Sequence, residues 1–574
     1  MSRRTIIFLL LCAFLAVMYM NRTLFSPTGD WDLVLSWTAG NDSAVTLEIP
    51  STERLRIDAW VKTAESAAEK LQVIAGQWML HEEMGAYDAY DPSPNLELDA
   101  TGFLGAIFDG RYIYFSPQHN KSERHGNVLR YDTHSPFHSP EAWSAVNAGN
   151  TDGLNTSGYY GGVFDGKYVY FTPRFDGTEM HSRVLRYDTS EQFSNMESWD
   201  AFDAGLEISY QGGGFDGQYV YFAPGSSSDG GSGVVLRYNT EGPFTEPASW
   251  ETTDLSMAFP ESAPADFDGV AFDGTWIYLV PLTGGLPVRY DTRLAFDDSD
   301  SWQLFDASSH GMEMCVGATF DGRYIYYVPY DHDKIVRYDT AKPFEAGPSW
   351  ESYSVQETTD ITSWGYDGAF FDGRFVHFVP FFYTDETGRM NFHGEHLRYD
   401  TRGDFTGPDS WKTSNQQVVS DLNTVGYNAG IFDGRYFYFS PWHDGEAYHE
   451  GGRIVGHSRV LRYDSLQEGT FLLRYNDYGH NGGLSGALPG PSFTILTDSG
   501  TRTVSANRPL SPGSYHIRGE YTGQSLRLFI DGELVSEVES EGNLIRSNRP
   551  LQIGNLENGN VPFTGSVLKL EIRQ

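Results

Sequence analysis

The chain has 574 residues and a formal net charge of −37, and 15% of its residues are aromatic. This length predicts two or three domains, and the acidity disfavours nucleic acid or an anionic membrane surface as a general partner. Only Cys12 and Cys315 are cysteines, and Cys12 lies in an N-terminal apolar run, so no intrachain disulfide framework is expected.

Residues 1–24 have the composition of an export segment. Arg3 and Arg4 precede an apolar run at 5–20, as a positive n-region precedes a hydrophobic h-region. The run is shorter than the roughly 20 residues of a comfortable membrane span, and no Ala-x-Ala cleavage site follows it. The segment is predicted to be a signal-anchor or a cleaved signal peptide. Either way the protein is exported, and it is membrane-anchored by this one segment or secreted.

Residues 31–83 carry strand patterns but no repeat. Residues 55–62 alternate with period two, which predicts a half-buried strand, and 70–78 predicts another. Some fifty residues hold too few strands for a sheet core of their own. This segment is therefore expected to pair with strands elsewhere in the chain.

Residues 86–465 are organised by seven copies of one motif. Each copy has Phe-Asp-Gly, an aromatic and β-branched run that ends at Pro, and later an Arg-Tyr-Asp or Arg-Tyr-Asn turn; Phe-Asp-Gly begins at 108, 164, 215, 272, 320, 371 and 432. Asp-Gly is a hairpin signal. Copies of about 50 residues with four antiparallel strands each are typical of β-propeller blades. Tyr-Asp followed by Trp resembles kelch repeats, which supports the propeller architecture.

The last copy lacks one strand. A Trp opens the fourth strand of six copies, at 143, 199, 250, 302, 350 and 411, and none follows Arg462-Tyr463-Asp464. Upstream, residues 87–91 resemble residues 199–203. We therefore expect 86–91 to supply the outer strand of the last blade and to close the ring.

Residues 469–574 leave the repeat and carry further strand patterns. Tyr521-Thr522-Gly523, residues 528–532, Ile553-Gly554 and Phe563-Thr564-Gly565 resemble the second half of a laminin-G-like, concanavalin A-type jelly roll. In that family the first half carries a strand that ends in Trp-Val-Lys, and Trp60-Val61-Lys62 matches it here. The resemblance implies one sandwich split between 31–83 and 469–574. The predicted fold is all-β: a seven-bladed β-propeller at 86–465 inserted into a jelly-roll β-sandwich, after an N-terminal apolar helix.

The loops between the second and third strands differ most from copy to copy, and unequal loops on a repeated framework are where function usually lies. They offer aromatic rings for the apolar face of a sugar and charged groups for its hydroxyls. The candidate ligand-binding residues are His119, His332, Tyr383, Arg389, His393, Trp442 and His443. The leading function is an extracellular carbohydrate-binding or adhesion protein, with a glycan, polysaccharide or glycoprotein as ligand at this face, at the sandwich or at both. Hydrated loops with incidental histidines would give the same pattern.

A polysaccharide lyase is the alternative. Some seven-bladed propellers are lyases that use His and Tyr as acid and base and Arg to neutralise a uronate, and His125, Tyr160, Arg174 and His181 look similar to that set. The resemblance implies proton abstraction α to a carboxylate followed by β-elimination. Protein–protein adhesion through the sandwich is a third possibility.

No metal site is predicted in the loops between the second and third strands, because no His-x-x-x-His spacing occurs within them. The laminin-G-like resemblance implies Ca²⁺ at the rim of the sandwich. Asn476, Asp477 and Asn481 are the candidates for it.

Overall fold

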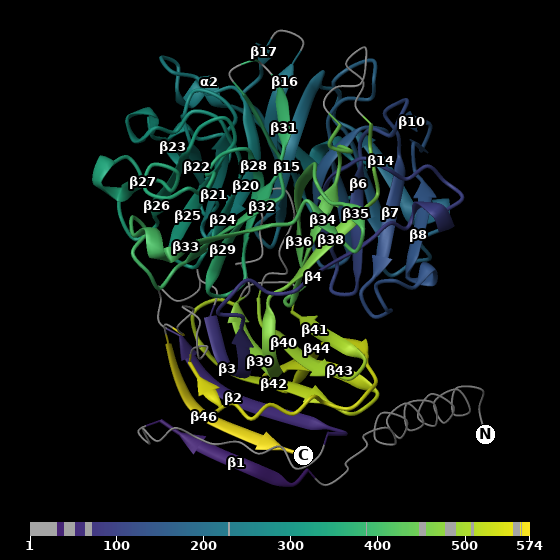
Figure 1. Cartoon of the computed structure of the whole chain (residues 1–574), viewed down its shortest axis with the longest axis vertical. Coiled ribbons are helices and arrows are strands. Elements are labelled where there is room, and N and C mark those ends of the chain that lie inside the picture. The colour runs from purple at the N-terminus through teal and green to yellow at the C-terminus, as the bar shows by residue number, and fades with distance from the viewer. Residues whose placement is uncertain are drawn as a thin grey trace, which may run out of the picture.

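The computed structural model of the chain describes residues 31–39, 52–63, 72–227, 230–385, 387, 389–446, 455–476, 490–506, 510–554, 563 and 565–574. The described strands form a ring of small sheets and, next to it, a two-sheet sandwich (Figure 1). The apolar helix predicted within 1–24 lies outside these ranges. No helix in the described part is long and apolar enough to span a bilayer.

Seven sheets with four main strands each can be followed among the described residues, and we number them as blades one to seven. The strands are given from inner to outer. Blade one has β5 (Phe103–Phe108), β6 (Tyr112–Pro117), β7 (Asn127–Asp132) and β8 (Trp143–Asn147), and blade two has β11 (Tyr159–Phe164), β12 (Tyr168–Pro173), β13 (Arg183–Asp188) and β14 (Trp199–Asp203). Blade three has β15 (Ile208–Phe215), β16 (Tyr219–Ser227), β18 (Val234–Asn239) and β19 (Trp250–Asp254), and blade four has β20 (Phe267–Phe272), β21 (Trp276–Pro281), β22 (Val288–Asp291) and β23 (Trp302–Leu304). Blades five to seven are β24 (Cys315–Phe320), β25 (Tyr324–Pro329), β26 (Lys334–Asp339), β27 (Trp350–Ser354); β28 (Tyr366–Phe371), β29 (Phe375–Pro380), β32 (Glu395–Asp400), β33 (Trp411–Asn415); and β36 (Tyr427–Phe432), β37 (Tyr436–Pro441), β38 (Val460–Asp464), β4 (Tyr87–Tyr90). Each inner strand contacts the inner strands of both neighbours, and β36 contacts β5, so the blades close into a propeller.

The ring is closed by a strand from far upstream. β4 pairs antiparallel with β38, with Tyr87 opposite Tyr463 and Tyr90 opposite Val460. The outer strand predicted at 86–91 is confirmed.

The repeated residues build the turns and hold the blades together. In blade one, Asp109 accepts the backbone N–H groups of Arg111 and Tyr112 with one oxygen and the Tyr114 hydroxyl with the other. Gly110 follows with a φ of 101°, which a residue with a Cβ rarely adopts. The outer-strand Trp143 donates its indole N–H to the carbonyl of Phe137, and five further blades repeat this bond.

Short elements decorate the blades. Six of the eight 3₁₀ helices in the described chain come directly before an outer strand; the eight are η1 (Ser93–Asn95), η2 (Pro140–Ala142), η3 (Met196–Ser198), η4 (Pro247–Ser249), η5 (Ser299–Ser301), η6 (Ser308–His310), η7 (Gly347–Ser349) and η8 (Pro408–Ser410). The blades also carry short hairpins and one short α-helix. They are β9 (Asn150–Thr151) with β10 (Leu154–Asn155), β34 (Val418–Val419) with β35 (Leu422–Asn423), β30 (Phe382–Thr384) with β31 (Met390–Phe392), β17 (Gly230–Gly231), which pairs with β16, and the helix α2 (Leu255–Ala258).

The sandwich is built from both ends of the chain. One sheet has the order β1 (Leu33–Thr38), β46 (Gly565–Arg573), β2 (Leu55–Thr63), β42 (Ser514–Tyr521), β43 (Ser525–Ile530), β44 (Glu533–Glu539), and the other β41 (Gly500–Ser505), β40 (Ser492–Thr497), β39 (Leu466–Asn476), β3 (Gln72–Leu80), β45 (Gln552–Ile553). Ile57 and Leu570 of the first sheet share one core with Phe471 and Phe493 of the second.

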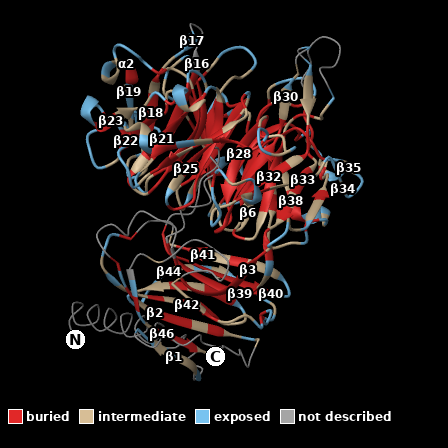
Figure 2. Ribbon diagram, turned by 60° about the vertical axis from the view of Figure 1, so that its left-hand side comes forward, coloured by how far each residue is buried: buried red, intermediate tan, exposed pale blue. Residues whose placement is uncertain are grey.

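The propeller and the sandwich share a second hydrophobic core. Trp78 and Leu472 of the sandwich pack in one buried cluster with Phe375 and Tyr399 of blade six. Burial is continuous through the blades and into the sandwich, whereas the outer loops are exposed (Figure 2). Arg398 lies in this junction, is 1% exposed, and donates to the carbonyls of residues 81–83, which connect the two bodies.

Candidate functional site

The two ends of the propeller differ in what they contact. The Asp-Gly hairpins and Arg-Tyr-Asp turns lie at the end that packs on the sandwich, where Arg374 pairs with Glu82 and Arg502 donates to the carbonyl of His134. The loops after the second strands and those before the inner strands lie at the opposite end. Figure 1 shows the β16–β17 hairpin and β31 at that end, far from the sandwich. We call this end the open face.

At the open face, the residue four positions before the Phe of each Phe-Asp-Gly is directed toward the propeller axis; it is the second residue of six inner strands and the fourth residue of the longer β15. The Tyr160 hydroxyl of blade two lies 2.9 Å from a carboxylate oxygen of Asp268 in blade four and 3.4 Å from the amide nitrogen of Asn428 in blade seven. Contacts that span so many blades require side chains that converge. These seven axial positions are Leu104, Tyr160, Gln211, Asp268, Val316, Asp367 and Asn428.

A special backbone follows each axial position. In six blades the next residue is a glycine with positive φ, and in blade seven it is Ala429 with a φ of 48°. A Cβ on Gly368 would lie 2.7 Å from the Cβ of Ala429. At this position, directly after the axial residue, the inner strands of blades six and seven approach too closely for a larger side chain. This close approach brings the axial side chains of neighbouring blades together.

Five of the axial side chains are polar and form one buried network. Gln211 donates its amide N–H to Asp268, Tyr160 donates its hydroxyl to Asp268, and Asn428 donates to Asp367. All five are at most 3% exposed. Blades two, three, four, six and seven thus supply one hydrogen-bonded cluster at the axis.

This network has strongly shifted protonation equilibria. Burial raises the pKa of Asp268 to about 7. Burial and the nearby charge of Asp268 raise the pKa of Asp367 well above its usual range. Burial, with Asp268 again, also raises the pKa of the Tyr160 hydroxyl, so Tyr160 stays protonated at neutral pH. Perturbed pKa values are typical of functional sites.

Arg174 lies beside this network. Its guanidinium carbon is 4.8 Å from the ring centroid of Tyr160, a distance at which a cation and an aromatic face attract each other. The structure therefore brings together Tyr160 and Arg174, two of the four residues predicted from the lyase resemblance.

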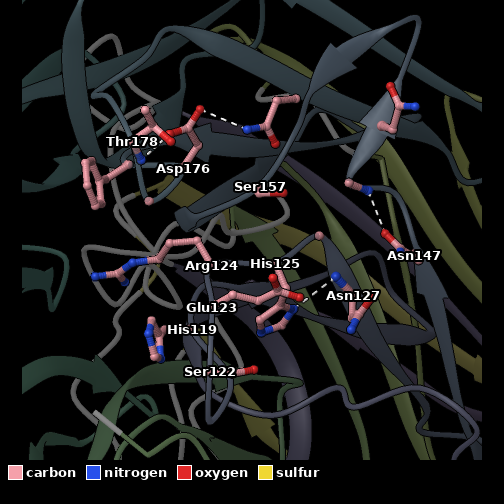
Figure 3. A pocket seen from close by; sticks show the side chains of 16 residues that line it. His119, Ser122, Glu123, Arg124, His125, Asn127, Asn147, Ser157, Asp176 and Thr178 are labelled. Atoms are coloured by element: carbon pink, nitrogen blue, oxygen red, sulfur yellow. Dashed lines mark hydrogen bonds between the residues drawn. The ribbon is translucent and has the colours of Figure 1, made fainter. Parts of the chain in front are cut away.

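A polar cavity of about 790 Å³ opens between blades one and two on the same face (Figure 3). His119, Arg124 and Glu123 line it from the loop after β6, and Asp176 and Thr178 from the loop after β12. Asparagines complete the wall; they are Asn127, Asn147, Asn150 and Asn155. Carboxylate, amide and guanidinium groups in a cavity of this size are suited to hydrogen bonding a ligand rich in hydroxyls.

The structure gives the predicted acid–base histidines a different role. His125 accepts the backbone N–H of Asn127 at Nδ1, so Nε2 carries the proton and donates to the carbonyl of Thr101. His181 makes the same pair of bonds with Arg183 and Ser157. Both rings are at most 5% exposed, and burial lowers the pKa of each to about 4. With both nitrogens engaged, these rings connect two loops of one blade and are not placed for proton transfer to a ligand.

The same bridge recurs in other blades. His393, predicted as a ligand-binding residue, accepts from the N–H of Glu395 and donates to the carbonyl of Gly365, and His457 bonds Arg459 and Val425 in the same way. A geometry repeated in four blades is a feature of the framework. We call His125, His181, His393 and His457 the bridging histidines.

We expect His181→Ala to lower the free energy of unfolding by about 1–3 kcal/mol, because it leaves a buried carbonyl and N–H unpaired. The folded-state pKa of about 4 lies below the ordinary 6.5, so the ring's contribution is full above pH 6.5 and is lost as the pH falls through 4. Urea denaturation at pH 7 and pH 5 would measure both effects. The exposed His138→Ala is the control, and an equal loss in both variants would contradict a bridging role.

Three of the remaining predicted residues lie at the rim of blades six and seven. Trp442 packs against Phe381 with ring centroids 5.4 Å apart, and His443 stacks on Phe392 at 4.4 Å. Tyr383 stacks on Trp364 at 5.2 Å. These rings form an aromatic wall on the side of the axis away from blade three.

The other candidates stand apart from this wall. Arg389 is exposed next to the β30–β31 hairpin, and His332 is buried in blade five with Nδ1 3.7 Å from Asp331. His119 lines the cavity beside Arg124, and burial and that arginine lower its pKa.

In the described part of the chain, no group of three or more His, Cys, Asp or Glu residues is placed to hold a metal ion. Two of the calcium candidates at the sandwich rim, Asp477 and Asn481, lie outside the described residues.

The differences between the loops did not point to the axial carboxylates, which lie inside the repeated inner strands. A signal was present in the sequence. In each copy the residue four positions before the Phe of Phe-Asp-Gly is followed by Gly or Ala, and this residue varies between Leu, Tyr, Gln, Asp, Val and Asn. A polar residue that varies inside an otherwise repeated strand is what a site on the axis requires.

Comparison with known proteins identifies the sandwich. Residues 457–573 match the family model of the Concanavalin A-like lectin/glucanases superfamily. The chain thus carries a concanavalin A-like, laminin-G-type domain at its C-terminus, as the sequence resemblance predicted. The search of curated proteins found no match.

Solved structures with similar architecture are distant. A streptogramin B lyase structure is 10% identical and covers 67% of this chain and 98% of its own, with a TM-score of 0.41. A catalytically inactive variant of virginiamycin B lyase from Staphylococcus aureus with quinupristin is 11% identical over 66% and 99% of the two chains, with a TM-score of 0.40. A fungal alcohol oxidase of the AA5 family in complex with copper is 10% identical over 80% and 99%, with a TM-score of 0.43. At these values neither substrate nor chemistry transfers to this chain.

Proposed function

We propose that this protein binds carbohydrate at the open face of its propeller, as an exported protein. The observation that carries the proposal is the cavity of about 790 Å³ between blades one and two, with its wall of amide, carboxylate and guanidinium groups. Such groups match sugar hydroxyls as donors and acceptors, and the aromatic wall across the axis offers rings for stacking. The lectin-like sandwich family supports the same class of ligand. The bound carbohydrate would be part of a polysaccharide or of a glycoprotein.

The framework also favours the open face over the other end. The sandwich covers the Asp-Gly end, where Trp78 and Phe375 lie in one core. Exposed loops lie at the other end, around β17 and α2, as Figure 2 shows. A long glycan could therefore lie across this face without displacing either domain.

Filling the cavity tests the proposal. Asn150 is exposed at the start of the β9–β10 hairpin and lines the cavity. On a glycan array followed by calorimetry with the best ligand, we expect Asn150→Trp to weaken binding at least about tenfold, or about 1.4 kcal/mol. The matched control is Val418→Trp, at the same place in the β34–β35 hairpin of blade six, where the side chain is 71% exposed. Wild-type affinity in Asn150→Trp, with melting temperature unchanged, would refute the site.

A polysaccharide lyase is the second candidate, favoured by the contact of Arg174 with Tyr160 above Asp268. In this reading Arg174 neutralises a uronate, Asp268 accepts the α proton, and Tyr160 is the proton donor, because its pKa is raised and that of Asp268 is about 7. The test is incubation with uronic-acid polysaccharides while the absorbance of an unsaturated product is followed. Binding without product would exclude the lyase and leave the binding proposal intact.

A further inference from the structure

Two arginines lie close together on the open face of a chain whose net charge is −37. Arg124 follows β6 in blade one, and Arg174 follows β12 in blade two. Their positive charges are near enough that Arg174 lowers the pKa of Arg124. Like charges repel, and the cost is greatest where water is partly excluded. An acidic protein that holds two cations together needs a compensating group.

Arg124 has little compensation within the described chain. Burial and Arg174 lower its pKa to about 10, and no carboxylate among the described residues offsets them. Its guanidinium donates to the neutral side-chain amide of Gln118 and lies 5.5 Å from the ring centroid of Phe175. Arg124 is half-buried, and a charge that loses part of its hydration without a partner of opposite sign is unfavourable.

Two carboxylates line the cavity. Glu123 is exposed and does not contribute to the pKa of Arg124, and the other is already engaged. Asp176 lines the same cavity, but its carboxylate pairs with Arg183 and accepts the backbone N–H groups of Thr178 and Glu179. Asp268 and Asp367 lie beneath Arg174, and their raised pKa values keep at least part of this pair protonated at neutral pH.

The position of the pair connects the cavity with the axis. Arg124 and His119 lie next to each other at one side of the cavity (Figure 3). Arg174 lies over Tyr160 at the axis. A chain of sugars that occupies the cavity would place a substituent between these guanidinium groups.

We infer that Arg124 and Arg174 bind the acidic group of an anionic polysaccharide, a carboxylate or a sulfate ester. This deepens the proposed carbohydrate binding and rests on it. A guanidinium offers two parallel N–H donors to a carboxylate or sulfate. The rings of Phe175 and Tyr160 hold the two arginines in place before the ligand arrives, so little side-chain entropy is lost on binding.

The test uses pairs of polysaccharides that differ in charge. The full chain is titrated with polygalacturonate and its fully methyl-esterified form, and with dextran sulfate and dextran, at low and high salt. We expect the charged member of at least one pair to bind at least about tenfold more tightly than its neutral partner, with affinity that falls as salt rises. The pair that shows the preference identifies the carboxylate or the sulfate ester as the group recognised.

Substitutions of the two arginines test whether they cause the preference for the charged polysaccharide. Arg124→Gln and Arg174→Gln should each remove most of it, leaving affinity near that of the neutral polymer. Lys121→Gln is the matched control: it removes an exposed cation from the same loop as Arg124 without lining the cavity, and it should retain the preference. Arg124→Gln removes a repulsive contact, so its melting temperature should not fall, and Arg174→Gln is an independent second variant.

Two outcomes separate the hypotheses. Equal binding of charged and neutral polymers, or a preference unchanged in both arginine variants, would overturn the anion site while leaving carbohydrate binding in place. Absence of binding to every polymer, neutral ones included, would overturn the proposed function and this inference with it.

Discussion

Arg398→Met is expected to lower the free energy of unfolding by about 3–5 kcal/mol. The Arg398 guanidinium donates to the carbonyls of His81, Glu82 and Glu83 and lies 3.8 Å from the ring centroid of Phe375. Methionine fills similar volume but donates nothing, so three carbonyls of the connection between the domains lose their partner. Urea denaturation followed by tryptophan fluorescence would measure the loss.

The matched control is the equivalent arginine of blade two. Arg186 stacks on Tyr168 and pairs with Asp200, whose side chain is 40% exposed. Water can replace that partner, so Arg186→Met should cost only about 1 kcal/mol. We also expect calorimetry of Arg398→Met to separate the melting of sandwich and propeller. Equal losses in the two variants and a single unchanged transition would show that Arg398 has no special role at the junction.

Asp367→Asn is expected to stabilise the protein by about 0.5–2 kcal/mol at pH 8 and to have little effect at pH 4. The folded-state pKa values of Asp367 and Asp268 are raised, that of Asp268 to about 7. Folding therefore favours the protonated forms, and stability is full below pH 4 and declines as the pH rises toward 7. Asparagine keeps the oxygen that accepts from Asn428 and removes the charge.

Urea denaturation from pH 4 to pH 8 would show that the free energy of unfolding changes less with pH in the variant than in the wild type. The exposed Asp360→Asn is the control and should leave the wild-type profile unchanged. Loss of stability at pH 8 in Asp367→Asn would mean that the carboxylate is charged and stabilising in the folded protein.

The strands and turns of both domains could be predicted from the sequence, because each is determined by a few neighbouring residues. The hairpin at Asp109-Gly110, the strand at 86–91 and the Trp60-Val61-Lys62 strand of the sandwich each follow from a few neighbouring residues and are present in the structure. Chemical roles were predicted for His125, His181 and His393, although the spacing around the bridging histidines also repeats: His181-Ser182-Arg183-Val184 and His457-Ser458-Arg459-Val460 match each other. Repetition of that kind indicates a structural role.

The axial network was not predictable in the same way. Tyr160 and Asp268 are separated by 108 residues and Tyr160 and Asn428 by 268, and each pair meets only because the ring closes. Their shared burial, which determines the pKa of Asp268, is a property of the whole propeller. The proximity of Arg124 and Arg174 likewise depends on how two adjacent loops fold.

The closing strand has a consequence for the order of folding during synthesis. β4 emerges from the ribosome early, but its partner β38 ends at Asp464. β3 likewise cannot pair until β39, which begins at Leu466, has been synthesised. The first two elements of the junction must therefore stay unpaired while six complete blades are made, with their hydrogen-bonding edges exposed. Contacts of such long sequence separation fold slowly. We expect newly made chains that stop before Asp464 to need protection from aggregation. The propeller can close once β38 has emerged, whereas the sandwich is complete only after β46.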